Sequence, residues 1–127
     1  MHIVTTDRAP KAIGPYSQAV MSGGFLFCAG QIGIDPASGK LAGADVETQA
    51  RQTLANIRNV LAAAGLGFGH VVKTTVFLAS MEDFPVVNGI YAQEFGEHKP
   101  ARSTVQVARL PLGARIEIEC IAEVQGK

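Results

Sequence analysis

The side chains best suited to chemistry lie near the carboxyl end of the chain, where Arg102 is followed by Glu117 and Glu119. A guanidinium matches an organic carboxylate through two parallel hydrogen bonds, and a glutamate can take a proton from water. These groups could therefore bind a small organic acid and direct water at it. Residue type alone favours a simpler interpretation, in which Arg102 is a solvated arginine that pairs with one of the glutamates.

Two segments with period-two alternation must position these groups. Residues 103–108 and 115–124 alternate in this way, and the proline and glycine between them predict an antiparallel hairpin. If the valines of the first strand share a core with the isoleucines of the second, the register must place odd-numbered residues of the first strand beside even-numbered residues of the second. It then places Arg102 and Thr104 with both glutamates on the face of the sheet that points away from the helices.

Two amphipathic helices are predicted to cover the other face. Asp45 has the residue type of an N-cap, apolar side chains recur at steps of three and four over residues 46–64, and Gly65 suits a left-handed C-cap. The second helix is expected over residues 84–96, with a proline in its first turn. Its apolar stripe is Phe84, Val87, Tyr91 and Phe95; Asn88 and Ile90 lie off that line, and Asn88 could face solvent or a cleft.

The remaining strands complete an α+β pattern. Residues 17–21 and 25–29 predict a hairpin that ends at Gly30, and residues 71–78 are typical of a central strand. The missing side chain of Gly30 lets another group approach the backbone, although a bulge or a packing glycine explains it equally simply.

The predicted order is strand, strand, helix, strand, helix, strand, strand, which favours a mixed sheet with two helices on one face. Residues 1–127 are expected to form one domain, with residues 1–12 peripheral and residues 34–44 in a loop.

Composition bears on partners. The chain has 11 basic and 11 acidic residues, so it offers no electrostatic footprint for nucleic acid. Its 47% hydrophobic content is high for a small domain, which has little interior in which to bury apolar surface. We therefore expect a homo-oligomer; the alternative is a monomer with an aggregation-prone apolar surface.

The cysteines and histidines favour no metal site. Cys28 and Cys120 lie in apolar strand patterns, and the three histidines are scattered, so we expect buried thiols in a reducing compartment. The apolar run near Phe25 is interrupted by glycines and is too short to span a membrane. With no signal-peptide pattern, the expected location is the cytoplasm.

Laid out in this way, the chain resembles the reactive intermediate deaminase family, also called the Rid or YjgF family, over essentially its whole length. The resemblance rests on several segments in the same order: Ala12-Ile13-Gly14-Pro15-Tyr16-Ser17, Gly30-Gln31-Ile32, Gln49-Ala50-Arg51-Gln52, Val72-Lys73-Thr74-Thr75-Val76-Phe77, Asn88, Pro100-Ala101-Arg102-Ser103 and Ile116-Glu117-Ile118-Glu119.

The resemblance implies a chorismate-mutase-like α+β fold, assembled as a homotrimer around a central β-barrel with sites in the clefts between subunits. It also implies hydrolysis of 2-imino acids, such as 2-iminobutanoate and 2-iminopropanoate, to 2-oxo acids and ammonia without a cofactor or metal. Such imines and their enamine forms arise from pyridoxal-phosphate enzymes. The alternative functions for this chain are non-catalytic binding or sensing of 2-oxo acids, or the activity of an endoribonuclease or chaperone-like member of the same family.

By resemblance, the carboxylate-binding arginine of the family is Arg102 and its water-positioning glutamate is Glu117. Gly30 matches the glycine that contributes its backbone, and Tyr16 and Asn88 match the tyrosine and asparagine of the cleft.

Three positions depart from the family pattern. Thr104, expected to bind substrate, replaces a cysteine of several relatives; its hydroxyl can keep a hydrogen bond but supplies no thiol. Ala29 replaces a frequent serine, and Lys99 replaces a frequent aromatic residue. We expect these changes to alter the rim of the cleft.

Overall fold

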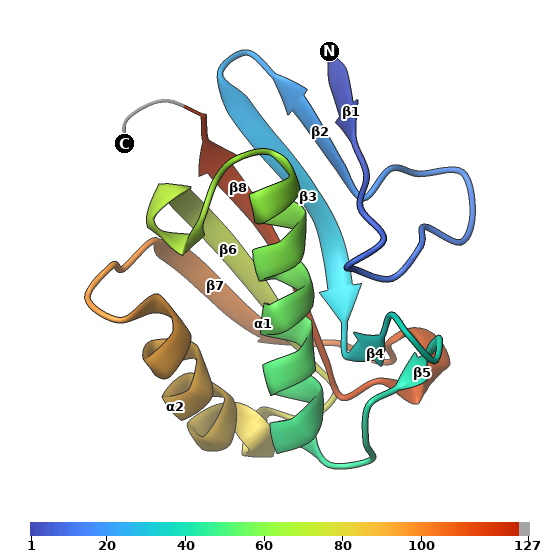
Figure 1. Ribbon diagram of the computed structural model, residues 1–127. Coiled ribbons are helices and arrows are strands. Elements are labelled where there is room, and N and C mark those ends of the chain that lie inside the picture. Colours follow the sequence, from blue (N-terminus) through green and yellow to red (C-terminus); the bar gives the residue numbers. More distant parts are fainter. Residues whose placement is uncertain (125–127) are drawn as a thin grey trace.

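The computed structural model describes residues 1–124, and the order of its elements confirms the α+β prediction (Figure 1). Short 3-10 turns precede β6, α2 and β8. The helices and strands are β1 (His2–Val4), β2 (Ala19–Ser22), β3 (Phe25–Ile32), β4 (Ile34–Asp35), β5 (Lys40–Leu41), α1 (Val46–Ala63), β6 (Val71–Leu78), α2 (Phe84–Phe95), β7 (Ala101–Gln106) and β8 (Ile116–Glu123).

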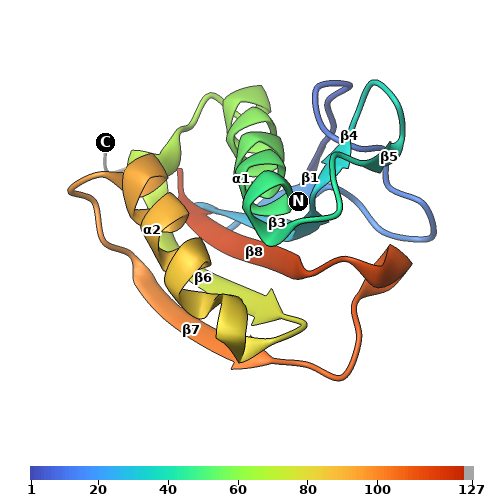
Figure 2. The ribbon, with the colours of Figure 1, turned by 90° about the horizontal axis from the view of Figure 1, so that it is seen from below.

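Six strands form one mixed sheet in the order β1-β2-β3-β8-β6-β7, in which only β6 and β7 run parallel. Figure 2 shows both helices on the same side of this sheet, as predicted. Strands β4 and β5 form a separate small ladder within the segment expected to be a loop.

Helix α1 begins and ends where the sequence predicts. The Asp45 carboxylate accepts a hydrogen bond from the Thr48 amide at 2.9 Å, which satisfies one of the free N–H groups of the first turn. At the other end Gly65 has φ +77°, and the Leu66 amide donates to the Leu61 carbonyl at 2.9 Å. This left-handed turn is open to glycine because it has no Cβ.

Helix α2 also has the predicted bounds, with Pro85 in its first turn and Gly96 at φ +61° just after its end. One detail was wrong: Ile90, expected off the apolar stripe, is only 4% exposed. The helix lies between α1 and the sheet edge, so a wider arc of its surface is covered than one stripe.

The core lies between the helices and the sheet. Alternate residues of the central strands point toward α1, and its apolar stripe meets them; the side chains less than 2% exposed include Leu26, Leu54, Ile57, Leu61, Val76, Ile116 and Ile118.

The predicted hairpin between residues 103–108 and 115–124 is wrong. Both strands exist, but β6 lies between β7 and β8. The chain passes from β6 through α2 to β7, a crossover that joins parallel neighbours and leaves β7 at the sheet edge. Local alternation identifies strands but not their partners. Val105, expected in the core, is consequently 43% exposed on the face away from the helices.

Residues 1–12 contain more structure than expected, because β1 pairs with β2 and Val4 is 5% exposed. None of the helices within residues 1–124 has both the length and the apolar character needed to cross a membrane.

The face of the sheet away from the helices is apolar and uncovered by this chain. Phe25 and Phe27 on β3 are 39% and 46% exposed, and Val105 lies on the same face. The predicted homo-oligomer would cover these side chains; its formation stays a prediction.

Candidate active site

All of the predicted site residues except Thr104 line one of two hollows in the surface. The first, of about 350 Å³, is lined by Tyr16, Gly30 and Glu117 together with apolar residues of neighbouring loops. The second, of about 380 Å³, lies between α2 and β7 and is lined by Asn88 and Arg102.

Gly30 and Glu117 are in close contact in the first hollow. A Cβ atom added at Gly30 would lie 2.1 Å from a carboxylate oxygen of Glu117. The two strands are paired here, with Ile32 opposite Glu117 across β3 and β8. The glycine is therefore required by the position of the carboxylate, and the close approach expected at Gly30 is real.

The Glu117 carboxyl group holds its proton more tightly than an ordinary glutamate. Partial burial raises its pKa above the usual 4.5, and the negative charge of Glu119 raises it further. A carboxylate with a raised pKa is a better base toward water than an exposed one. The chemistry predicted for Glu117 suits this environment.

A loop carries Tyr16 to the first hollow. The backbone of this loop is held by the buried side chain of Gln18, whose amide donates to the Pro10 carbonyl at 2.7 Å and whose oxygen accepts from the Thr6 amide at 2.7 Å. Tyr16 itself is 53% exposed, and its hydroxyl accepts from the Ile13 amide at 3.4 Å. Its ring is therefore available to a ligand or a neighbouring chain.

Asn56 fixes the opposite wall of the first hollow and was missed by sequence reasoning. Its buried amide donates from α1 to the carbonyl oxygens of Ile32 at 3.1 Å and Ile34 at 2.9 Å. Next to it, a Cβ on Gly33 would lie 2.6 Å from the Gln49 carbonyl oxygen. An asparagine on the apolar face of a predicted helix was the available signal.

Arg102, together with Lys99, supplies the positive charge of the second hollow. Its guanidinium carbon lies 4.8 Å from the centre of the Tyr91 ring and 5.5 Å from that of Phe84. No carboxylate within residues 1–124 forms an ion pair with it. The interpretation of Arg102 as a partner of Glu117 or Glu119 within the chain is therefore excluded for the described residues.

The second hollow contains two further residues that were expected at the cleft and one that was not. Asn88 faces the hollow rather than the core, and Lys99 lies at its rim. Thr104 lines neither hollow; its hydroxyl oxygen is enclosed and has no hydrogen-bond partner among residues 1–124. His98 also lines this hollow, held by a 2.6 Å contact from Nε2 to the Val71 carbonyl, and was not predicted there.

Arg102 and Glu117 lie on opposite faces of the sheet, so the prediction that they share one face is wrong. On β6, Thr74 is opposite Arg102 and Phe77 is opposite Glu117. Thr74 and Phe77 are three residues apart on one strand, and such residues point to opposite faces. The predicted parity depended on the hairpin that does not form. One chain therefore presents two separate half-sites.

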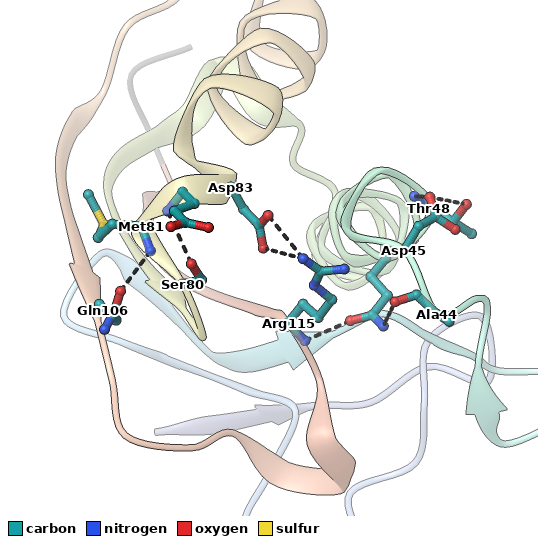
Figure 3. Close-up of polar contacts among 10 residues, drawn as sticks. Ala44, Asp45, Thr48, Ser80, Met81, Asp83, Gln106 and Arg115 are labelled. Atoms are coloured by element: carbon teal, nitrogen blue, oxygen red, sulfur yellow. Dashed lines mark hydrogen bonds and ion pairs between the residues drawn. The ribbon is translucent and has the colours of Figure 1, made fainter.

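An ion pair joins the elements that carry the two hollows. Arg115, at the start of β8, donates to both carboxylate oxygens of Asp83 at 3.1 Å, just before α2 (Figure 3). The Arg115 amide also donates to Gln49 of α1 at 2.8 Å. These contacts fix the start of α2 relative to β8.

The two thiols are poor candidates for chemistry. Cys28 and Cys120 are opposite each other across β3 and β8, buried and without a disulfide. Their mutual hydrogen bond and burial raise the pKa of the Cys120 thiol, so it stays protonated. Within residues 1–124, no three His, Cys, Asp or Glu side chains are grouped as metal ligands.

Comparisons with known proteins agree with the residue pattern. The family model for Endoribonuclease L-PSP matches residues 6–124. The human 2-iminobutanoate/2-iminopropanoate deaminase is 52% identical over 124 residues, which cover 98% of this chain and 90% of the human protein.

Two solved structures from E. coli share the fold. The YjgF gene product superposes with a TM-score of 0.93 at 47% identity, covering 98% of this chain and 100% of that one. TdcF with bound serine also gives 0.93 at 47% identity, covering 97% and 98% of the two chains. This chain therefore belongs to the Endoribonuclease L-PSP family, which includes YjgF and the reactive intermediate deaminases.

Proposed function

We propose that this protein hydrolyses 2-imino acids to 2-oxo acids and ammonia, at a site made of the Arg102 half of one protomer and the Glu117 half of the next. The observation that carries this proposal is the separation of complementary groups into two hollows on opposite faces of one sheet. Neither hollow holds both Arg102 and Glu117.

A 2-imino acid carries a carboxylate beside its electrophilic carbon. The unpaired guanidinium of Arg102 binds that carboxylate with two parallel hydrogen bonds, which fixes the position of the adjacent carbon. Asn88, on the same hollow, supplies amide hydrogen-bonding groups at the rim. The enclosed hydroxyl of Thr104 is a further group for substrate binding.

Glu117 then acts on water. It takes a proton as the water oxygen bonds to the imine carbon, while the electrons of the C=N bond move to nitrogen. It returns that proton to the nitrogen; it then takes the proton of the new hydroxyl and passes it to the same nitrogen as the C–N bond breaks, so that ammonia leaves and the oxygen becomes the carbonyl of the 2-oxo acid. Gly30 leaves room for this carboxylate and presents its own backbone, and Tyr16 closes the hollow. No cofactor or metal takes part in this scheme.

The walls of the first hollow favour a short aliphatic substrate side chain. Ile32, Ile34 and Leu112 line it, and no charged residue other than Lys11 and Glu117 does so among the described residues. An apolar side chain gains by leaving water for such a wall. This matches the imines named for the human relative, 2-iminobutanoate and 2-iminopropanoate.

A homotrimer is the assembly we propose. Contact between one hollow and a different hollow on the next copy is heterologous, and we propose that the rotation between copies closes these contacts into a ring of three rather than an open filament. The exposed aromatic side chains of β3 would be buried at the centre of the ring, as a β-barrel of the three sheets. Bound serine in TdcF, a small carboxylate-bearing molecule, supports the same class of ligand.

The location we propose is the cytoplasm, where the two buried cysteines would remain reduced. We propose no nucleic-acid or membrane partner, because the net charge is zero and the hollows suit a small molecule.

The deciding assay couples an amino-acid oxidase, which generates imines, to detection of 2-oxo acid and ammonia. Faster release of ammonia by the wild-type protein than by buffer supports the proposal. Arg102→Ala should remove most of this rate while the assembly, measured by light scattering, is unchanged. Pyruvate binding without any acceleration would instead identify a 2-oxo acid sensor.

A further inference from the structure

Arg102 is held differently from the other arginine that lies over an aromatic ring. Arg58 lies 5.9 Å from the centre of Phe68, but its guanidinium also donates to Glu94 at 2.7 Å. Arg102 has two aromatic rings near it, at 4.8 and 5.5 Å, and no carboxylate among the described residues. Its charge is thus compensated by ring faces alone within the chain.

Aromatic faces leave the hydrogen-bonding edge of a guanidinium free. A ring attracts the cation through its quadrupole, whereas a protein carboxylate would occupy the N–H groups that a ligand needs. The pair of rings therefore limits the motion of Arg102 without competing for its donors. This is the arrangement expected of a preorganised receptor for a carboxylate.

The two rings are themselves fixed. The Tyr91 hydroxyl lies 2.7 Å from the hydroxyl of Thr74, which is the strand neighbour of Arg102. The Tyr91 ring also stacks on Phe95, with 4.4 Å between ring centres and 23° between planes. Burial raises the pKa of Tyr91, so its hydroxyl is neutral at pH 7. Phe84 packs against the core from the first turn of α2.

We propose that Phe84 and Tyr91 are positioning residues, which hold the Arg102 guanidinium over two ring faces and aim its free N–H edge at the substrate carboxylate. This inference rests on the proposed function and deepens it. Phe84 and Tyr91 lower the conformational freedom of the Arg102 side chain before substrate arrives. Loss of either ring should therefore weaken binding of the ground state and of the transition state alike.

The test uses the full-length assembly, with imine hydrolysis and pyruvate binding as readouts. Phe84→Leu keeps an apolar side chain of similar reach but removes one ring. KM for the imine and Kd for pyruvate should rise about three- to tenfold, with kcat within about twofold. Tyr91→Leu should have a similar or larger effect.

Variants that retain a ring supply the rescue. Phe84→Tyr and Tyr91→Phe should leave KM within about twofold of the wild type, because the ring face remains. Phe68→Leu is the matched control, because it removes the ring beside Arg58; Phe68 lines neither hollow and reaches the second only through Phe95, whose ring centre lies 4.7 Å away. It should change KM by less than about twofold. Should Tyr91→Leu fail to fold, Phe84→Leu decides, because Phe84 is only partly buried.

Two failures are distinguishable. If Arg102→Ala abolishes hydrolysis but Phe84→Leu changes KM no more than Phe68→Leu does, the positioning role is wrong and the proposed function stands. A fall in kcat with KM unchanged in Phe84→Leu also overturns the positioning role. If Arg102→Ala leaves both hydrolysis and pyruvate binding unchanged, the proposed function is wrong, and the inference with it.

Discussion

The two hollows of this chain are built in opposite ways. The first gathers a carboxylate and a glycine from neighbouring strands, and its charge is negative at Glu117. The second gathers a guanidinium and aromatic rings from a strand and the helix beside it. In the first, burial raises the pKa of the acid; in the second, ring faces accept the cation without neutralising it.

The difference has a physical purpose if one site uses both halves. Arg102 and Glu117 then come into contact only when subunits assemble, so a lone chain holds no complete site. Placing them on opposite faces of the sheet prevents that contact within the protomer. The following experiments test whether the active site is divided between the two hollows in this way.

Mixing two inactive variants gives the largest expected effect. Arg102→Ala should lose at least roughly a hundredfold in kcat/KM, because the substrate carboxylate loses a charged, bidentate partner. Glu117→Gln should lower kcat more than it weakens pyruvate binding. Unfolding and refolding the two variants together should restore about a quarter of the wild-type rate if subunits mix at random around a ring.

In such mixtures, one quarter of the interfaces combine an intact arginine with an intact glutamate by chance. Each variant refolded alone is the control. If the mixture is no more active than either variant alone, the two halves do not meet between subunits, and the shared site is wrong.

Substitutions at two glycines should separate an effect on catalysis from an effect on stability. In Gly30→Ala, the new methyl group meets the end of the Glu117 side chain, which can turn away. Activity should fall about tenfold or more, since the base leaves its position, with the melting temperature nearly unchanged. In Gly33→Ala, the methyl group meets the Gln49 backbone instead.

The Gln49 backbone belongs to α1 and cannot turn away, so Gly33→Ala should destabilise the fold by about 1–3 kcal/mol. Urea unfolding of both variants beside the wild type gives the free energies. Equal stability losses for the two glycines would contradict the assignment of Gly30 to the site.

A smaller effect is expected in the pH dependence of kcat/KM, which should follow the ionisation of Glu117. The base must be ionised, so kcat/KM should rise with pH and reach its midpoint above the usual glutamate value of 4.5. Glu119→Gln removes the nearby negative charge and should move that midpoint to lower pH. A midpoint that does not respond to Glu119→Gln would show that another group limits the rate.

The same pKa has an effect on stability with a definite sign. A carboxyl with a raised pKa binds more protons folded than unfolded, so stability falls as pH rises from 4.5 through the folded pKa. Glu117→Gln should therefore be at least as stable as the wild type at pH 7, and lose that advantage at low pH. A lower melting temperature at pH 7 would mean that the carboxylate is stabilising.

The contact between the two regions should matter least. Asp83→Asn weakens the ion pair with Arg115, whose side chain is 42% exposed, so the expected loss is about 0.5–1 kcal/mol by thermal unfolding. Glu47→Gln, which weakens the exposed pair with Arg51, is the matched control and should change stability less.

Much of the fold could be predicted from the sequence, because helix caps and the spacing of apolar residues are local features. The cap at Asp45, the glycines at 65 and 96 and the spacing of apolar residues gave both helices with correct bounds. The short β1 strand was missed, since three residues carry little alternation of their own.

For the site, the sequence predicted which residues take part but not how they are arranged. The family resemblance identified residues that the structure does place around hollows, but the reasoning from alternation put Arg102 and Glu117 together. The supporting residues were not foreseen in these roles: Gln18 and Asn56 act through hydrogen bonds to distant backbone, and Tyr91 and Phe84 were assigned only to the apolar stripe of α2.

The sequence by itself determined the two helices, their apolar faces and the longer strands, because these depend on contacts a few residues apart. Only the tertiary structure decided that β6 lies between β7 and β8. That choice comes from long-range pairing and the α2 crossover, and no period in the sequence encodes it. The registers of β7 and β8 on β6 then separate the guanidinium from the carboxylate, because Arg102 lies opposite Thr74 and Glu117 opposite Phe77, and these two residues point to opposite faces.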